Sequence, residues 1–111
     1  MTANKAIEII DRLKPNVYSE EDKLRWIDEL DGMVQRLVIQ ADKVIQYSYP
    51  EDMDKELLIP APFENLYVLY LEAKIDYHNR EYANYNNSAM MFESQFSEYK
   101  KAYIRKNRAK G

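Results

Sequence analysis

The chain has 111 residues and a net charge of −3, and at this length we expect one domain, over residues 1–111, with a hydrophobic core of its own. It contains no cysteine, which excludes disulfides and thiolate metal sites. Its start lacks the apolar core of a signal peptide, and no apolar run approaches the roughly 20 residues of a membrane span, so we expect a soluble, intracellular protein with no membrane contact.

The first helix is predicted over residues 3–13. Thr2 can cap its beginning, and Pro15 ends it, because the residue before a proline is pushed out of the helical conformation. The apolar positions that share one face are Ala6, Ile7, Ile10 and Leu13. This spacing predicts an amphipathic helix that packs on a core.

The second helix is predicted over residues 20–39. Ser19 can cap it, with Asp22 three residues later in the arrangement of a capping box. Its apolar face comprises Leu24, Ile27, Leu30, Val34, Leu37 and Val38. Gly32 lies inside this helix at a cost of about 1 kcal/mol relative to alanine, which indicates either a close helix crossing or a tolerated defect.

A loop of about 15 residues follows, because the helical pattern fails between residues 41 and 58. It contains an acidic run over residues 51–56. A loop of this length in a small domain is either mobile or functional. The short apolar segment 57–59 that ends it can join a neighbour's sheet edge or tuck under the helices, and we favour tucking because three residues make a poor strand.

Two further helices are predicted over residues 63–78 and 82–105. Each carries an aromatic stripe at helical spacing: Phe63, Leu66, Tyr70, Ala73 and Tyr77 on one, and Tyr82, Tyr85, Ala89, Phe92, Phe96, Tyr99 and Tyr103 on the other. Asn79 can adopt the left-handed conformation that ends a helix. We therefore predict an all-α fold, a small bundle of about four helices with a long C-terminal antiparallel helical hairpin, in which Phe92 and Phe96 belong to the core.

No catalytic, cofactor-binding or metal-binding residues are predicted. Glu72, Asp76, His78 and Glu81 lie close in sequence, but His78 is the only histidine, and helical metal sites draw ligand sets from several helices. There is no glycine-rich phosphate loop, and no serine lies in an activating motif. We therefore expect that the protein is not an enzyme. The polar stretch 86–88 opposes helix propensity in mid-helix, and buried amides there would specify the register between helices or subunits.

Charge is strongly segregated along the chain. Residues 1–99 hold 10 basic and 19 acidic side chains, a net charge of −9, whereas the six charged residues from position 100 onward are all basic. The candidate partner-binding residues are Lys100, Lys101, Arg105, Lys106 and Arg108. This basic tail, which can be flexible over residues 104–111, is either a solvated helix end suited to the helix dipole or a contact with an acidic partner or DNA phosphates.

Four stretches together resemble one family of small phage proteins: LRWIDELDG at 24–32, LLIPAPFENLY at 57–67, the segment from Tyr70 through DYHNREY to residue 82, and YNNSAMMF at 85–92. They are similar to head-to-tail connector, or head-completion adaptor, proteins encoded by tailed phages and by prophages of Gram-positive bacteria. The similarity covers most of residues 5–100. That family often has Asn-Gly-Glu where this chain has Asn79-Arg80-Glu81.

The resemblance implies a non-enzymatic structural protein of the virion neck, made in the host bacterial cytoplasm. Such a subunit docks on the portal protein, meets other neck proteins and forms a homo-oligomeric ring between head and tail. The basic tail could also contact DNA. The alternative function is a small helical regulator or adaptor that binds nucleic acid or a host protein.

Overall fold

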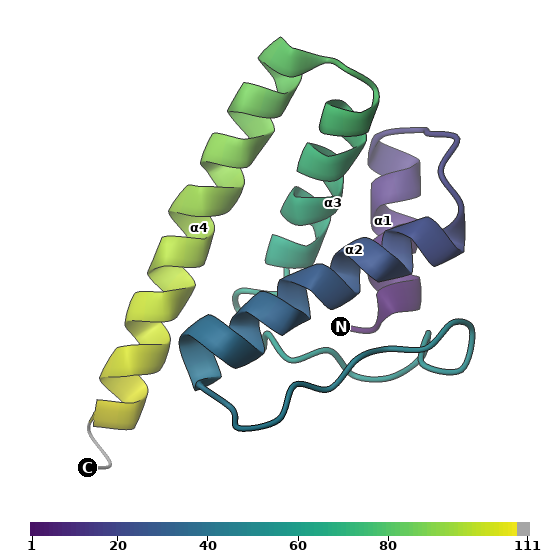
Figure 1. Cartoon of the computed structure of the whole chain (residues 1–111). Coiled ribbons are helices and arrows are strands. Elements are labelled where there is room, and N and C mark those ends of the chain that lie inside the picture. The colour runs from purple at the N-terminus through teal and green to yellow at the C-terminus, as the bar shows by residue number, and fades with distance from the viewer. Residues whose placement is uncertain (109–111) are drawn as a thin grey trace.

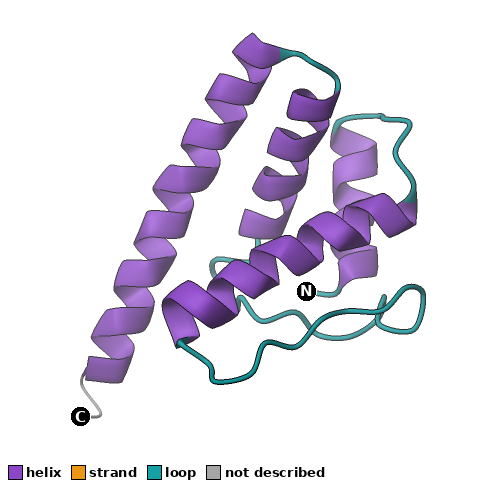
Figure 2. Cartoon of the chain, in the orientation of Figure 1, coloured by secondary structure: helices purple, strands orange, loops and turns teal. Residues whose placement is uncertain are grey.

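Helices dominate residues 1–108, which the computed structural model describes (Figure 1). Their order is α1 (Ala3–Leu13), α2 (Glu20–Met33), the π-helix η1 (Val34–Ile39), α3 (Leu66–His78) and α4 (Tyr82–Arg108). Figure 2 shows helices joined by loops, without a strand in the described residues, although one isolated antiparallel bridge joins Thr2 and Glu56. The predicted all-α fold with a long C-terminal hairpin is confirmed.

Both predicted N-terminal caps are present. The Thr2 hydroxyl accepts a hydrogen bond from the Lys5 backbone N–H at 3.1 Å, and the Ser19 hydroxyl accepts one from Asp22 N–H at 3.0 Å. Each satisfies a backbone donor that the first turn of a helix leaves without a partner. The prediction that Leu13 belongs to the buried face of α1 is wrong, because α1 ends there and 69% of that side chain is exposed.

The helix predicted over residues 20–39 changes to π geometry after Met33. The Gln35 side-chain amide donates to the Asp31 carbonyl at 3.1 Å, at the turn where the change occurs. A π-helix has one more residue between hydrogen-bonded partners than an α-helix, so the side chains that follow are rotated about the helix axis. Leu37, predicted to be buried, is therefore 57% exposed. Gln40 ends the segment with a left-handed φ of 59°.

Gly32 does not mark a helix crossing. A Cβ at this position would lie 3.3 Å from a guanidinium nitrogen of Arg36, four residues further along. The missing side chain therefore leaves room for the arginine of the next turn.

Aromatic rings pair along the interface between α3 and α4, the most extensive contact between two helices. The ring centroids of Tyr70 and Phe92 lie 5.1 Å apart, those of Phe63 and Tyr99 5.6 Å, and those of Tyr77 and Tyr85 5.4 Å. Such tilted pairs add about 0.5 to 1.5 kcal/mol each beyond their burial. The two stripes predicted from sequence do face each other as an antiparallel hairpin.

α3 begins at Leu66, three residues after its predicted start. The residues between are held by turn hydrogen bonds, from Phe63 N–H to the Pro60 carbonyl at 2.9 Å and from Leu66 N–H to the Phe63 carbonyl at 3.0 Å. Pro60 and Pro62, which come just before Phe63, have no N–H to donate. The chain therefore approaches the helix through turns.

The left-handed residue at the corner of the hairpin is Arg80, with φ 60°, and not Asn79, with φ −78°. Asn79 remains helical because its N–H donates to the Ile75 carbonyl at 2.9 Å. Glu81 N–H then donates to the Asp76 carbonyl at 2.9 Å. Together with the bond from Arg80 N–H to the Tyr77 carbonyl at 3.0 Å, the Glu81 bond closes a Schellman-type end, which requires a left-handed residue directly after Asn79.

A buried carboxylate on α2 anchors the long loop. Asp31 is fully buried and accepts hydrogen bonds from the hydroxyls of Tyr47 and Tyr67 and, at 3.2 Å, from the backbone N–H of Leu58. The Tyr67 hydroxyl in turn accepts from Ile59 N–H at 2.8 Å. Three separate segments therefore meet at one side chain.

Two neighbours of Asp31, Asp28 on α2 and Gln35 on η1, hold the beginning of the same loop. Asp28 accepts from Tyr47 N–H at 2.8 Å. The Gln35 side chain accepts from Ile45 N–H at 2.7 Å and donates to the Ile45 carbonyl at 3.0 Å, so it pairs with that residue as a strand would. At the other end of the loop Leu57 and Ile59 are buried, which confirms that the apolar segment tucks under the helices.

The hairpin prediction can be tested at two phenylalanines. Phe92 is buried, as predicted, but Phe96 is only partly buried against the core. We expect Phe92→Ala to lower the unfolding free energy by about 3 kcal/mol, since it leaves a cavity, and Phe96→Ala to lower it by less. Urea denaturation of both variants measures this, and an equal or reversed order would contradict the packing described above.

Asp31 gives a pH-dependent prediction. Desolvation by burial raises the pKa of its carboxyl above the ordinary value of 3.8, against the lowering effect of the tyrosine hydroxyls. The folded protein therefore holds this proton more tightly than the unfolded chain does, and the stability it contributes is lost as pH rises from 3.8 through the folded pKa. Relative to Asp31→Asn, which cannot titrate, the wild type should lose unfolding free energy across this window.

Urea melts at a series of pH values measure the difference between wild type and Asp31→Asn. Asp42→Asn is the matched control, because Asp42 is exposed. A difference for Asp31→Asn that stays constant, or that grows in favour of the wild type as pH rises, would contradict the burial of an ionisable group.

Candidate functional site

Two hollows flank Tyr103 in the C-terminal part of α4, on the side where this helix passes η1 and the end of the long loop. The first, of about 280 Å³, lies between α4 and η1. The second, of about 380 Å³, lies between α4 and residues 58–63 of the loop. Tyr103 and Asn107 border both.

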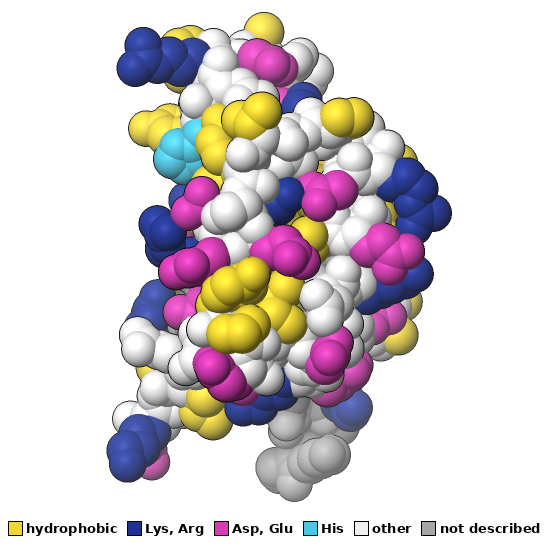
Figure 3. All heavy atoms as spheres, turned by 90° about the vertical axis from the view of Figure 1, so that its right-hand side faces the viewer, with side chains coloured by type: hydrophobic (Ala, Val, Ile, Leu, Met, Phe, Trp, Pro, Cys, Tyr) yellow, Lys and Arg dark blue, Asp and Glu magenta, His cyan; other side chains and the backbone are white. Residues whose placement is uncertain are grey.

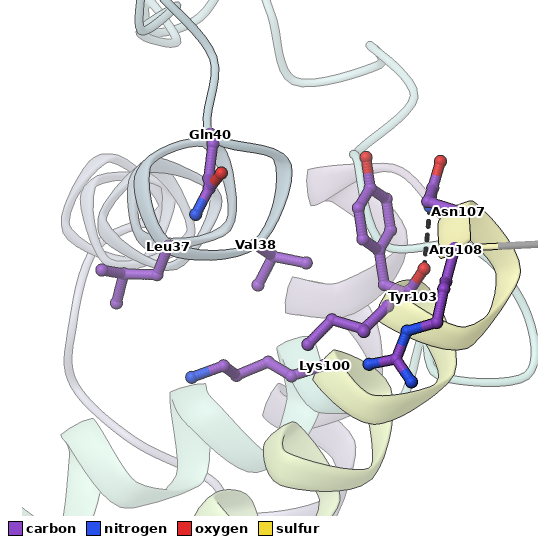
Figure 4. A pocket seen from close by; sticks show the side chains of 8 residues that line it. Leu37, Val38, Gln40, Lys100, Tyr103, Asn107 and Arg108 are labelled. Atoms are coloured by element: carbon purple, nitrogen blue, oxygen red, sulfur yellow. Dashed lines mark hydrogen bonds between the residues drawn. The ribbon is translucent and has the colours of Figure 1, made fainter. Parts of the chain in front are cut away.

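Figure 4 shows the first hollow, where Leu37 and Val38 of η1 face Lys100 and Tyr103 of α4 across the gap. The Asn107 side-chain amide donates to the Tyr103 carbonyl at 2.8 Å. This bond joins the Asn107 side chain to the helix backbone four residues earlier.

The walls of the hollows are unusually apolar for a surface. Leu37 is 57% exposed, Ile104 48%, Leu58 38% and Ile39 37%. The π geometry of η1 turns the first of these outward, and the anchoring of the loop brings Leu58 beside α4. Sequence reasoning had assigned Leu37 to the core, so the apolar half of this surface was missed.

Three of the five predicted partner-binding residues border the hollows. Lys100 and Arg108 line the first, and Lys106 lines the second. Lys101 and Arg105 are exposed and line neither, because successive residues of a helix point about 100° apart. The structure therefore divides a sequence cluster into three cations that ring an apolar surface and two that point away.

These cations have few anionic partners. Within the described residues, Lys101 is paired with Glu98 at 3.8 Å, whereas Lys100, Lys106 and Arg108 have no carboxylate within 4 Å. Residues 104–108, part of the predicted tail, are helical; residues 109–111, including Lys110, lie outside the described residues. Burial raises the pKa of Tyr99, which lines the second hollow, to about 12, so its hydroxyl stays neutral.

This surface, which we call the basic end of α4 (residues 100–108 with the two hollows), is suited to binding. Apolar walls favour burial of aliphatic or aromatic side chains, and cations at the rim favour carboxylates or phosphates. A protein segment with both features would match it.

The residues considered for a metal do not converge. The buried Asp76 carboxylate forms an ion pair with Lys14 and accepts from the Ser88 hydroxyl at 2.9 Å. The His78 ring stacks on Trp26 at a centroid distance of 5.1 Å. Within residues 1–108 no group of three or more candidate ligands has the arrangement needed to hold a metal ion.

The polar stretch 86–88 also has a structural explanation. Asn86 and Asn87 are exposed, while Ser88 is buried and donates to Asp76. The two amides of this stretch are therefore exposed, and the one buried polar group is the Ser88 hydroxyl. The hydrogen bond to Asp76 raises the pKa of the Lys14 ammonium. Asp76 of α3 therefore links the residue that caps α1 to Ser88 of α4.

Comparison with models of protein families, with curated proteins and with solved structures found no match. Among residues 1–108, no helix combines the length and the apolar character that crossing a membrane requires.

Neutralising Arg105, Lys106 and Arg108 together to glutamine should leave the fold intact. These side chains are exposed, and exposed charges near a helix end contribute little, so we expect the unfolding free energy to change by less than about 1 kcal/mol. Circular dichroism and urea melts measure the effect. A larger loss would show that the cations hold the last turns of α4 in place, which would make their role structural.

Proposed function

We propose that this protein is a non-enzymatic structural subunit of a phage virion, a head-to-tail connector that docks on the portal protein and assembles as a ring. The observation that carries the proposal is the basic end of α4. There, apolar side chains lie together with cations that have no carboxylate partner among residues 1–108, on a chain whose residues 1–99 carry −9. Such a surface is suited to an acidic, partly apolar protein neighbour.

The stretches that carry the family resemblance are also those that hold the fold together. Asp31, in the stretch 24–32, binds Leu58 and Tyr67, both in the stretch 57–67. Asp76 binds Ser88, and both of these lie in the remaining two stretches. Buried polar networks restrict substitution because every partner must be kept, so a resemblance at these residues supports a shared fold.

The corner of the hairpin gives a second line of support. Connector proteins often have glycine in Asn-Gly-Glu, and the corresponding residue here is Arg80, which has a left-handed φ of 60°. Glycine adopts that conformation at no steric cost. The same corner therefore suits both sequences.

A test of this function uses the portal protein from the genome that encodes the chain. We expect purified portal rings to retain the wild-type protein near physiological ionic strength in co-sedimentation, and we expect portal, capsid and tail genes beside its gene. A genome region without a portal gene, or no retention at micromolar concentrations of both proteins, would contradict the proposal.

Duplex DNA is the competing partner. A regulator that used the basic end would bind duplex with micromolar or tighter affinity, and the logarithm of the affinity would fall with a slope of about 0.9 per phosphate contacted as the logarithm of salt concentration rises. We expect no such binding, since the acidic remainder of the protein repels a duplex. Tight binding that the Arg105, Lys106 and Arg108 triple variant abolishes would favour the regulator instead.

A further inference from the structure

We propose that the basic end of α4 receives the acidic turn, residues 48–54, of a second copy of this chain. The inference rests on the proposed function, which it deepens by naming the neighbour at this surface. The two surfaces lie at opposite sides of the molecule: in Figure 1 the last turns of α4 are at the lower left, and the long loop turns back at the right-hand edge.

The acidic turn has the chemistry that the hollows require. Tyr49 is 41% exposed, Pro50 beside it is exposed, and the exposed carboxylates of Glu51 and Asp54 follow. Figure 3, which views the molecule from this side, shows hydrophobic side chains with acidic side chains around them. An apolar group bordered by carboxylates on this side therefore matches an apolar hollow bordered by Lys100, Lys106 and Arg108 on the other.

The turn is also held in one shape before any partner arrives. The Asp52 carboxylate accepts from Ser48 N–H at 2.7 Å, and Asp52 N–H donates to the Ser48 carbonyl at 2.9 Å. Met53 is buried, and its carbonyl accepts from Asn4 N–H at 3.0 Å. A preorganised turn loses little conformational freedom on docking.

The contact joins two different surfaces of the same chain. Each copy that inserts its turn into a neighbour leaves its own basic end open for the next copy. Such head-to-tail contacts build a ring when the rotation between copies closes, and a filament when it does not. A two-fold dimer would consume both surfaces at once and is not what this arrangement builds.

Two neutralised variants separate the surfaces. Lys106→Gln with Arg108→Gln disables the basic end, and Glu51→Gln with Asp54→Asn disables the turn while keeping the acceptor that Asp54 offers Asn4 at 2.5 Å. In sedimentation velocity at low salt we expect the wild type to exceed dimers with increasing concentration and each variant alone to stay monomeric. Their equimolar mixture should stop at a dimer, because only one working contact remains.

The control for the basic end is Lys101→Gln with Arg105→Gln, which removes the same charge outside the hollows and should assemble as the wild type does. Assembly lost equally in this control would overturn the proposal, since net charge alone would then decide it. A wild type that stays monomeric at low salt would also overturn the proposal. The same holds if the equimolar mixture of the basic-end variant and the turn variant stays monomeric.

Cysteine cross-linking tests the same contact without relying on charge, and the chain has no cysteine of its own. Mixed Ile104→Cys and Glu51→Cys proteins should form a disulfide-linked dimer at least tenfold faster than either alone. Met90→Cys, on α4 and 68% exposed, replaces Ile104→Cys as the control. Equal rates, or a dominant link between two copies of Ile104→Cys, would overturn the head-to-tail arrangement.

These outcomes are independent of the portal. Retention on portal rings with no cross-link between copies would leave the proposed function standing and reject this inference. Cross-linking without retention would do the reverse. Micromolar duplex DNA could also abolish the cross-link between Ile104→Cys and Glu51→Cys while Glu51→Gln with Asp54→Asn leaves assembly unchanged. That result would assign the basic end to nucleic acid and reject the inference as well.

Discussion

The Asp31 carboxylate is the point on which the arrangement of this small protein depends. It sits in the core and forms no ion pair with any cation among residues 1–108, and two tyrosine hydroxyls and one backbone N–H satisfy its oxygens. A buried polar group is tolerated only when it is hydrogen-bonded. The donors come from α3 and from both ends of the long loop, so satisfying this one group fixes how the loop lies across α2.

That constraint places the candidate binding surface. The loop has almost no regular structure, yet Asp28 and Asp31 of α2 and Gln35 of η1 hold it against these two helices. Its return path brings Leu58 beside the last turns of α4, while η1 presents Leu37 on the other side of Tyr103. The hollows are therefore a consequence of core hydrogen bonding, and a weakened Asp31 network would disturb them from a distance.

The helices could be predicted from the sequence, because their signals are local. The caps at Thr2 and Ser19 act within one turn, and the aromatic stripes act between adjacent helices. The exceptions have tertiary causes. The π geometry after Met33 coincides with a Gln35 side chain that serves the loop, and the left-handed corner at Arg80 follows from the hydrogen bond of Glu81 to Asp76.

The candidate site was only partly predictable for the same reason. Its cations lie within nine residues of sequence and could be recognised as a charge cluster. Its apolar walls come from η1, the loop and α4, which are joined only by folding, and no local pattern distinguishes an outward Leu37 from a buried one.

Buried and exposed charged side chains differ in their partners in this protein. The difference indicates which of them serve the fold and which belong to a binding surface. Asp31 and Asp76 are buried in the core with partners supplied by other elements, and Lys23 is buried against Asp11. Removing any one partner would leave a group that costs several kcal/mol, so these positions serve the fold. Among residues 1–108, Lys100, Lys106 and Arg108 have no carboxylate within 4 Å, and exposed charges of this kind add little to stability. Together with the exposed aliphatic side chains beside them, they form the surface for which we propose a neighbour, because association would desolvate the apolar walls and pair the cations with carboxylates.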